Sequence, residues 1–173
     1  MKKLLCLMLA LLLLCGAASA ETVFSASDYD VIATLPEGYA MSQSLTNDDG
    51  MLVASFRGDE DDALLMLVVA EDPAYAGYTL TRELSDKEYA ELVTPMTADY
   101  AAPVVTFLET EAGTPLICIR EEGSASEYAT IYTIYQGWIV QLWLQPAAGT
   151  TELPEDVVDV AVELLSGMQM VRK

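Results

Sequence analysis

The chain has 173 residues, and its 27 acidic residues against 8 basic ones give it a formal net charge of −19. A chain this acidic is repelled by nucleic acid and by anionic lipid, so nucleic-acid binding is excluded as a function. The chain contains no histidine, which excludes Ser-His-Asp and Cys-His catalysis together with metal sites that need an imidazole ligand.

The first 20 residues are predicted to be a secretory signal peptide. Lys2 and Lys3 give it a basic start, and residues 4–14 form an apolar run that is short for a membrane span. Small residues then lead up to Ala20. We expect cleavage after Ala20, which leaves a secreted or extracytoplasmic protein with no transmembrane span.

A lipoprotein signal that uses Cys15 is the alternative to simple cleavage. Leu14 stands where such signals normally have a small residue, so cleavage after Ala20 is preferred. Because Lys2 and Lys3 leave with the signal, residues 21–173 carry a net charge of −21, two more negative than the whole chain. By length these residues form a single domain.

Short strands and turns are predicted in the first half of this domain. Residues 21–30 are predicted to be a polar lead-in that Phe24 and Tyr29 tie to a sheet. Strands are predicted at residues 31–35, 39–45 and 51–57, with a Pro-Glu-Gly turn after the first and an Asp-Gly turn before the last.

The next run, residues 63–70 (ALLMLVVA), is apolar at every position. A strand that faces water on one side alternates between apolar and polar residues. The run therefore predicts a sheet that is covered on both faces.

Two acidic turns are candidates for calcium binding, Asn47-Asp48-Asp49 and Asp59-Glu60-Asp61-Asp62. They close opposite ends of the strand at residues 51–57, and neither has the spacing of an EF-hand loop. Acidic turns that only aid solubility are the preferred interpretation, so no metal or cofactor is predicted.

Two amphipathic helices are predicted to cover the sheet. The first begins at Ser85, which forms a capping box with Glu88, and Pro95 should bend or end it. The second runs over about residues 154–166, with Gly167 as its stop. Their predicted buried sides are Tyr89, Leu92, Val93, Met96 and Tyr100 in the first helix and Val157, Val158, Ala161, Leu164, Leu165 and Met168 in the second.

Four strands between the helices are predicted to form an antiparallel meander. They span residues 104–110, 115–121, 128–135 and 138–146, and residues 168–171 add a short terminal strand. The chain is therefore predicted to be α+β, an α/β/α sandwich in which two helices flank an antiparallel sheet of about six or seven strands.

The hairpin at residues 127–145 has two predicted faces. With Gln136-Gly137 as a type I′ turn, Tyr135 faces Trp138, and one face becomes almost entirely apolar and belongs to the core. The other face is mixed, and it supplies the candidate binding residues Tyr128, Tyr132, Gln141, Trp143 and Gln145.

Aromatic faces of this kind bind proteins or sugars. Alternatively, the first helix covers this face through Tyr89 and Tyr100. Cover by the helix is the preferred interpretation, because a large exposed aromatic patch is unusual on a soluble monomer.

Four segments resemble a known family: residues 32–39 (IATLPEGY), 111–115 (EAGTP), 135–138 (YQGW) and 153–171. In order and spacing they resemble the PsbP/Mog-type α/β/α sandwich family, which includes small exported bacterial proteins. The resemblance covers nearly all of residues 21–173 and is carried by turns and patterns. It implies the fold given above and a non-enzymatic partner protein. The family shares no catalytic motif, so no functional residue is implied.

No catalytic site is predicted. Cys118 is the one cysteine of residues 21–173, and its apolar strand predicts a buried, inert thiol. The carboxylates fall in turns or on solvent faces, and no glycine-rich phosphate loop occurs. We predict an exported, non-catalytic domain that binds another protein of the envelope or extracellular space. A carbohydrate- or small-ligand-binding module that uses the aromatic hairpin face is the alternative, and an enzyme comes third.

Overall fold

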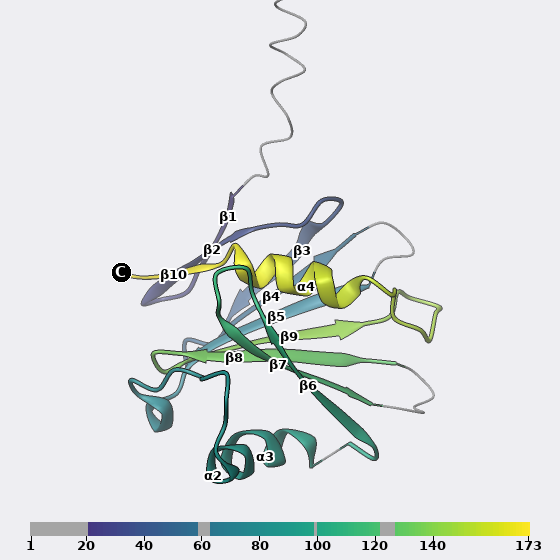
Figure 1. Ribbon diagram of the computed structural model, residues 1–173. Helices are drawn as coiled ribbons and strands as arrows, with labels where there is room; N and C mark the ends of the chain where they lie inside the picture. Colours follow the sequence, from purple (N-terminus) through teal and green to yellow (C-terminus); the bar gives the residue numbers. More distant parts are fainter. Residues whose placement is uncertain (1–20, 59–62, 99, 122–126) are drawn as a thin grey trace, which may run out of the picture.

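The computed structural model describes residues 21–58, 63–98, 100–121 and 127–173. Within these ranges the strands form two antiparallel sheets, one of seven strands and one of three (Figure 1). The main sheet consists, in spatial order, of β3 (Ala40–Thr46), β4 (Leu52–Arg57), β5 (Leu64–Glu71), β9 (Trp138–Gln145), β8 (Ala129–Tyr135), β7 (Pro115–Glu121) and β6 (Pro103–Glu109). The small sheet consists of β1 (Glu21–Ser25), β2 (Tyr29–Thr34) and β10 (Gln169–Arg172), in the order β1-β2-β10.

The hairpin of β8 and β9 confirms the predicted turn and register. Gln136 and Gly137 both have positive φ angles, 50° and 89°, as a type I′ turn requires. Tyr135 pairs with Trp138 and Ala129 with Leu144. Gly137 is needed for a second reason, because a Cβ atom there would lie 3.2 Å from the carbonyl oxygen of Tyr75.

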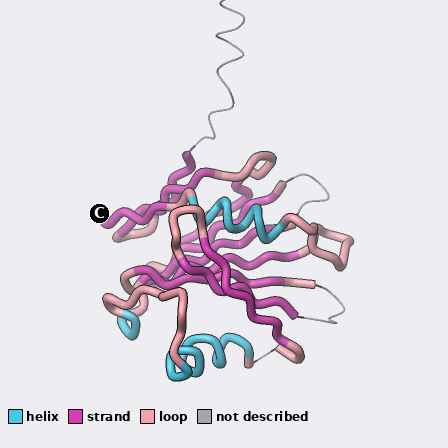
Figure 2. Tube along the Cα trace, in the orientation of Figure 1, coloured by secondary structure: helices cyan, strands magenta, loops and turns pink. Residues whose placement is uncertain are grey.

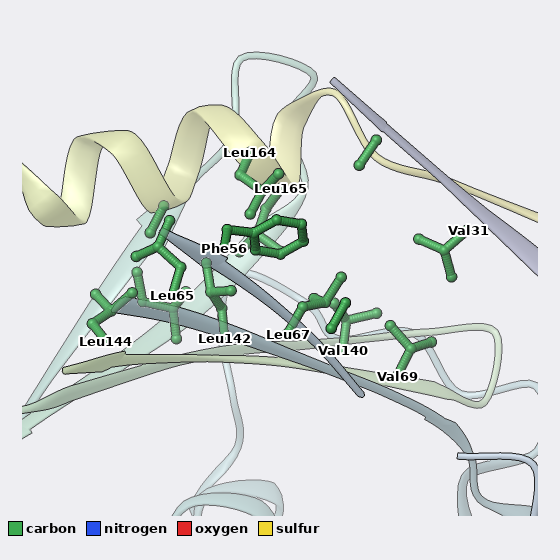
Figure 3. Close-up of a cluster of buried hydrophobic side chains, with 14 of the residues drawn as sticks. Val31, Phe56, Leu65, Leu67, Val69, Val140, Leu142, Leu144, Leu164 and Leu165 are labelled. Atoms are coloured by element: carbon green, nitrogen blue, oxygen red, sulfur yellow. The ribbon is translucent and has the colours of Figure 1, made fainter. Parts of the chain in front are cut away.

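One face of the main sheet, called the closed face below, packs against α4 (Val157–Ser166) and the small sheet. Figure 3 shows the side chains that meet there, drawn from β4, β5, β9, β2 and α4. Labelled residues of this core are Val31, Phe56, Leu65, Leu67, Val69, Val140, Leu142, Leu144, Leu164 and Leu165. The predicted helix stop is also confirmed, since the Gly167 amide caps the end of α4.

The three-stranded sheet was not anticipated from the sequence. A polar lead-in is predicted over residues 21–30, whereas β1 forms there and pairs with β2. The predicted anchors do tie it to the core: the Phe24 ring meets Phe56 edge-to-face with centroids 5.5 Å apart. The Tyr29 hydroxyl lies 2.9 Å from the carbonyl oxygen of Val69 and accepts a hydrogen bond from the amide of Leu52.

A short helical segment covers part of the opposite face. It consists of α2 (Asp86–Glu88), the π-helical turn η2 (Tyr89–Val93) and α3 (Thr94–Thr97), and the 3-10 turn η1 (Pro73–Tyr75) precedes it. The capping box of Ser85 and Glu88 is confirmed. The π turn ends at Val93, two residues before Pro95, whose missing amide hydrogen accounts for the irregular hydrogen-bond ladder.

The helical segment lies over one end of the main sheet, near β6, β7 and β8 (Figures 1 and 2). Leu92 and Val93 are its buried residues. They form a second core together with Leu80 and with Ile117, Ile119, Tyr132 and Ile134 of β7 and β8. Tyr89, which was predicted to lie on the buried side, is instead 40 % exposed and is not part of this core.

The prediction that residues 63–70 are covered on both faces is wrong for one face. Leu65, Leu67 and Val69 are fully buried on the closed face, whereas Leu64, Met66 and Val68 are only half-buried. The reason is geometric. Seven strands spaced about 4.8 Å apart span roughly 29 Å, while a helical segment of this length reaches about 18 Å.

None of the described helices is both long enough and apolar enough to cross a lipid bilayer.

Candidate functional site

The uncovered half of the second sheet face is the candidate site, and we call it the open face. It is built from side chains of β3, β4, β5 and β9 that point away from the closed face. Its apolar members are Leu45, Val53, Leu64, Met66, Val68 and Trp143, and its polar members are Gln43, Ser55, Arg57, Gln141 and Gln145.

Strand register arranges these side chains in cross-strand rows. Residues that pair directly across neighbouring strands stand on the same face, about 5 Å apart. One row runs Leu45, Val53, Val68, Gln141; the next runs Gln43, Ser55, Met66, Trp143; the third runs Arg57, Leu64, Gln145. Apolar and polar side chains therefore lie side by side on a surface roughly 14 Å wide across four strands.

The open face is accessible to solvent. Leu45 is 58 % exposed and Trp143 is 41 % exposed, and Val53, Leu64, Met66 and Val68 are half-buried. The described residues form two buried cores, one on the closed face and one under the helical segment, and the apolar residues of the open face belong to neither. These apolar side chains are therefore accessible to a binding partner.

The five residues predicted from the hairpin do not form one continuous surface. Gln141, Trp143 and Gln145 of β9 lie on the open face. Tyr132 of β8 is fully buried under the helical segment, where burial raises the pKa of its hydroxyl, and it donates to the carbonyl oxygen of Leu92 over 3.4 Å.

Tyr128 lies at the border between the covered and the open parts. Its ring contacts Tyr100 with centroids 5.3 Å apart, and its hydroxyl donates to the Glu121 carboxylate. That hydrogen bond, together with one from the Ala101 amide, lowers the pKa of Glu121. Tyr100 therefore packs against the mixed face of the hairpin, as predicted.

The described side chains of the open face are mostly uncharged. Among its described side chains, Arg57 carries the one formal charge, and the remainder are amides, hydroxyls and apolar groups. Ser55 is already engaged, since its hydroxyl lies 2.8 Å from that of Ser42. Such groups donate and accept hydrogen bonds but do not exchange protons near neutral pH.

Cys118 projects into the core beneath the closed face and is 2 % exposed. Burial raises the pKa of its thiol, so the reactive thiolate form is suppressed at neutral pH. The side chain behaves as a small apolar residue of the core.

The acidic turns show no metal geometry where they are described. Asn47 Oδ1 accepts hydrogen bonds from the amides of Asp49 and Met51, 3.0 and 2.8 Å away, and so shapes the turn itself. Residues 59–62, the second candidate turn, lie outside the described residues. Across the described ranges, no group of three or more Asp, Glu, Cys or His residues is placed to hold a metal ion.

Sequence reasoning missed most of the open face. Its residues on β3, β4 and β5 come from segments 70 to 100 positions away from β9 in the chain. The apolar run at residues 63–70 is the local signal of the open face, but the same pattern is typical of a strand that is covered on both faces. No local sequence motif specifies that β5 pairs with β9.

No protein-family model matches the chain, and no curated protein matches it. The solved structures that are similar to it include the following two. CyanoP, the cyanobacterial PsbP of Synechocystis sp. PCC 6803, has 14 % identity and a TM-score of 0.41, with 90 % of this chain and 96 % of that chain covered. A protein of Bacteroides thetaiotaomicron VPI-5482 has 9 % identity and a TM-score of 0.42, with 83 % of this chain covered.

The chain spans 45 % of the length of the Bacteroides protein. At these identities and scores, neither similarity assigns the chain to a family. The fold class itself, α+β with antiparallel sheets and helices on both sides of the main sheet, follows from the strand pairing and the two cores.

Proposed function

We propose that residues 21–173 form an exported, non-catalytic domain that binds a partner protein across the open face. The observation that supports this most is the position of six apolar side chains on four adjoining strands. They stay exposed or half-buried, while the other face of three of these strands, β4, β5 and β9, is buried. Export is supported by the signal-peptide pattern of the first 20 residues.

The composition of the open face matches the centre of a protein interface. Trp143 and Met66, a directly paired couple, belong to residue types that are enriched in such centres. Around them, Gln43, Gln141 and Gln145 supply the neutral hydrogen-bonding groups of a polar rim. A standard interface buries roughly 800 Å² on each partner, and we expect surface next to the open face to contribute as well.

The partner is expected to bind the face of the sheet rather than its edge. β3 ends the strand order of the main sheet, but its pairing with β4 shifts register between Met41 and Gln43. A bulge of this kind twists an edge strand and disfavours the addition of a further strand.

Sugar binding is the second candidate, because a shallow depression brings two of the predicted residues together. Tyr128 and Gln145 line it with Glu127, Pro146 and Thr150, and it encloses about 320 Å³. An aromatic ring, an amide and a carboxylate are the groups that sugar sites combine. A glycan array with the wild-type chain and a Gln145→Ala variant tests this candidate.

The protein-binding proposal is tested with a pair of double variants. Leu45→Ser/Trp143→Ala removes the two most exposed apolar side chains of the open face. Val104→Ser/Val171→Ser is the matched control, because these valines are 37 % and 46 % exposed but lie elsewhere. Each tagged full-length chain captures proteins from its native host, and the affinity of each captured protein is then measured by calorimetry after purification.

We expect one protein to bind the wild type and the control alike and to bind the open-face variant at least about tenfold more weakly. Equal affinity for all three chains would contradict the proposal. Loss of binding in the control variant alone would show that the interface lies near Val104 or Val171 rather than on the open face.

A further inference from the structure

A cavity of about 430 Å³ lies on the closed-face side of the main sheet, away from the open face. Leu116, Val140 and Leu165 form an apolar, buried part of its wall. Exposed residues of the β8–β9 turn and of β10, including Gln136 and Arg172, form its rim. Its size is that of pockets that hold small organic molecules.

Thr133 is the unusual residue of this wall. It is 6 % exposed, and its Oγ1 is buried without a hydrogen-bond partner among the described residues. The other buried threonines have partners: Thr110 Oγ1 accepts from the amide of Thr114, and Thr130 Oγ1 lies 3.2 Å from the hydroxyl of Tyr100. Native proteins rarely leave a buried hydroxyl unpaired, because its desolvation is then not offset.

Thr133 stands on the cavity side of β8 rather than on the side of the second core. Thr133 pairs with Val140, and both line the cavity. A valine would fill the same space without an unpaired polar atom. A ligand that enters the cavity would supply the partner that the protein does not.

The charge of the lining restricts the ligand. None of the residues that line the cavity is a carboxylate, although the chain has 27 acidic residues. Arg172 is the one formally charged lining residue. Its guanidinium lies 5.5 Å from the centre of the Trp138 ring and pairs with the Glu71 carboxylate. A positively charged head group would meet no anionic partner in the wall and would approach Arg172 at the rim.

We propose that this cavity binds a small amphiphile with a mainly apolar body, a hydrogen-bonding group that meets Thr133 Oγ1, and no positive charge. The apolar body packs against Leu116, Val140 and Leu165. This site is separate from the open face, and the two proposals fail or succeed independently.

The two tryptophans of the chain allow a direct test, because Trp138 lines the cavity and Trp143 lies on the open face. In a Trp143→Phe background, Trp138 is the sole tryptophan, and its emission reports on the cavity. The probes are decanol, decanoate and decylammonium, each titrated below its critical micelle concentration. We expect a saturable change with decanol or decanoate, and binding of decylammonium weaker by about tenfold or more.

Variants of Thr133 in the same background link binding to the hydroxyl. Thr133→Val should weaken the better probe about tenfold, whereas Thr133→Ser, which keeps the hydroxyl, should bind within about twofold of the background chain. Leu116→Phe, which narrows the cavity without adding a second tryptophan, should weaken binding at least about tenfold. Urea unfolding of each variant verifies that it is folded.

Three results would overturn the proposal. The first is the absence of a saturable change with any probe. The second is a folded Thr133→Val variant that binds as the parent does, which would mean that water alone satisfies the hydroxyl. The third is unchanged binding to a folded Leu116→Phe variant, which would place the probe elsewhere on the chain.

Discussion

The two faces of β5 have almost the same composition but differ in burial. Leu65, Leu67 and Val69 are sealed beneath α4 and the small sheet, whereas Leu64, Met66 and Val68 remain half-buried on the open face. Hydrophobicity along the strand therefore does not decide burial. Burial depends instead on which elements pack over each face. On the second face, one short helical segment covers only the end of the sheet that holds β7 and β8.

The difference between the faces should be largest in the effect of truncation on stability. Leu67→Ala removes a fully buried side chain and should lower the free energy of unfolding by about 3 kcal/mol. Met66→Ala, the adjacent residue on the open face, should lower it by less than about 1 kcal/mol. Urea unfolding of both variants measures this, and similar losses would show that the open face is packed after all.

Two buried threonines of β8 should respond in opposite directions to the same substitution. Thr133→Val removes an unpaired buried hydroxyl and should raise the free energy of unfolding by about 1 kcal/mol. Thr130→Val breaks the contact with the Tyr100 hydroxyl and should lower it by about 1 kcal/mol. Changes of the same sign in the two variants, measured without ligand, would contradict the assignment of Thr133.

The cover of the second face should be less stable than that of the closed face. Ser85→Ala removes the cap of the helical segment and should lower stability by about 1 kcal/mol. Amide hydrogen exchange should quicken over residues 86–97 and stay unchanged over α4. Uniform quickening over both regions would mean that the two covers open together.

The smallest expected effect is a pH dependence at the border of the open face. The hydrogen bond from Tyr128 lowers the pKa of Glu121, so this carboxylate stabilises the fold above its unfolded pKa of about 4.3 and ceases to do so as the pH falls through its lower, folded pKa. Glu121→Gln should therefore be less stable than wild type at pH 6, and the difference should shrink toward pH 3. A difference that is constant with pH would exclude this linkage.

The features of the fold that depend on a few adjacent residues could be predicted from the sequence. The Gln136-Gly137 turn and the Ser85 cap are each set by a few adjacent residues. The small sheet and the β5–β9 pairing bring together distant segments, and no turn or cap specifies such contacts. The open face was predicted only at Gln141, Trp143 and Gln145 for this reason, and the cavity at Thr133 depends on how β10 returns to the sheet.

The central claim is that the open face binds a protein, and a photo-reactive benzoylphenylalanine at position 143 tests it most directly. The full-length chain would be irradiated in its native host, with the same group at position 104 as the control, since Val104 is exposed outside the open face. We predict one cross-linked protein at position 143 that is absent at position 104 and is lost when Leu45→Ser and Met66→Ser are added. No cross-link at position 143, or the same products at both positions, would contradict the account.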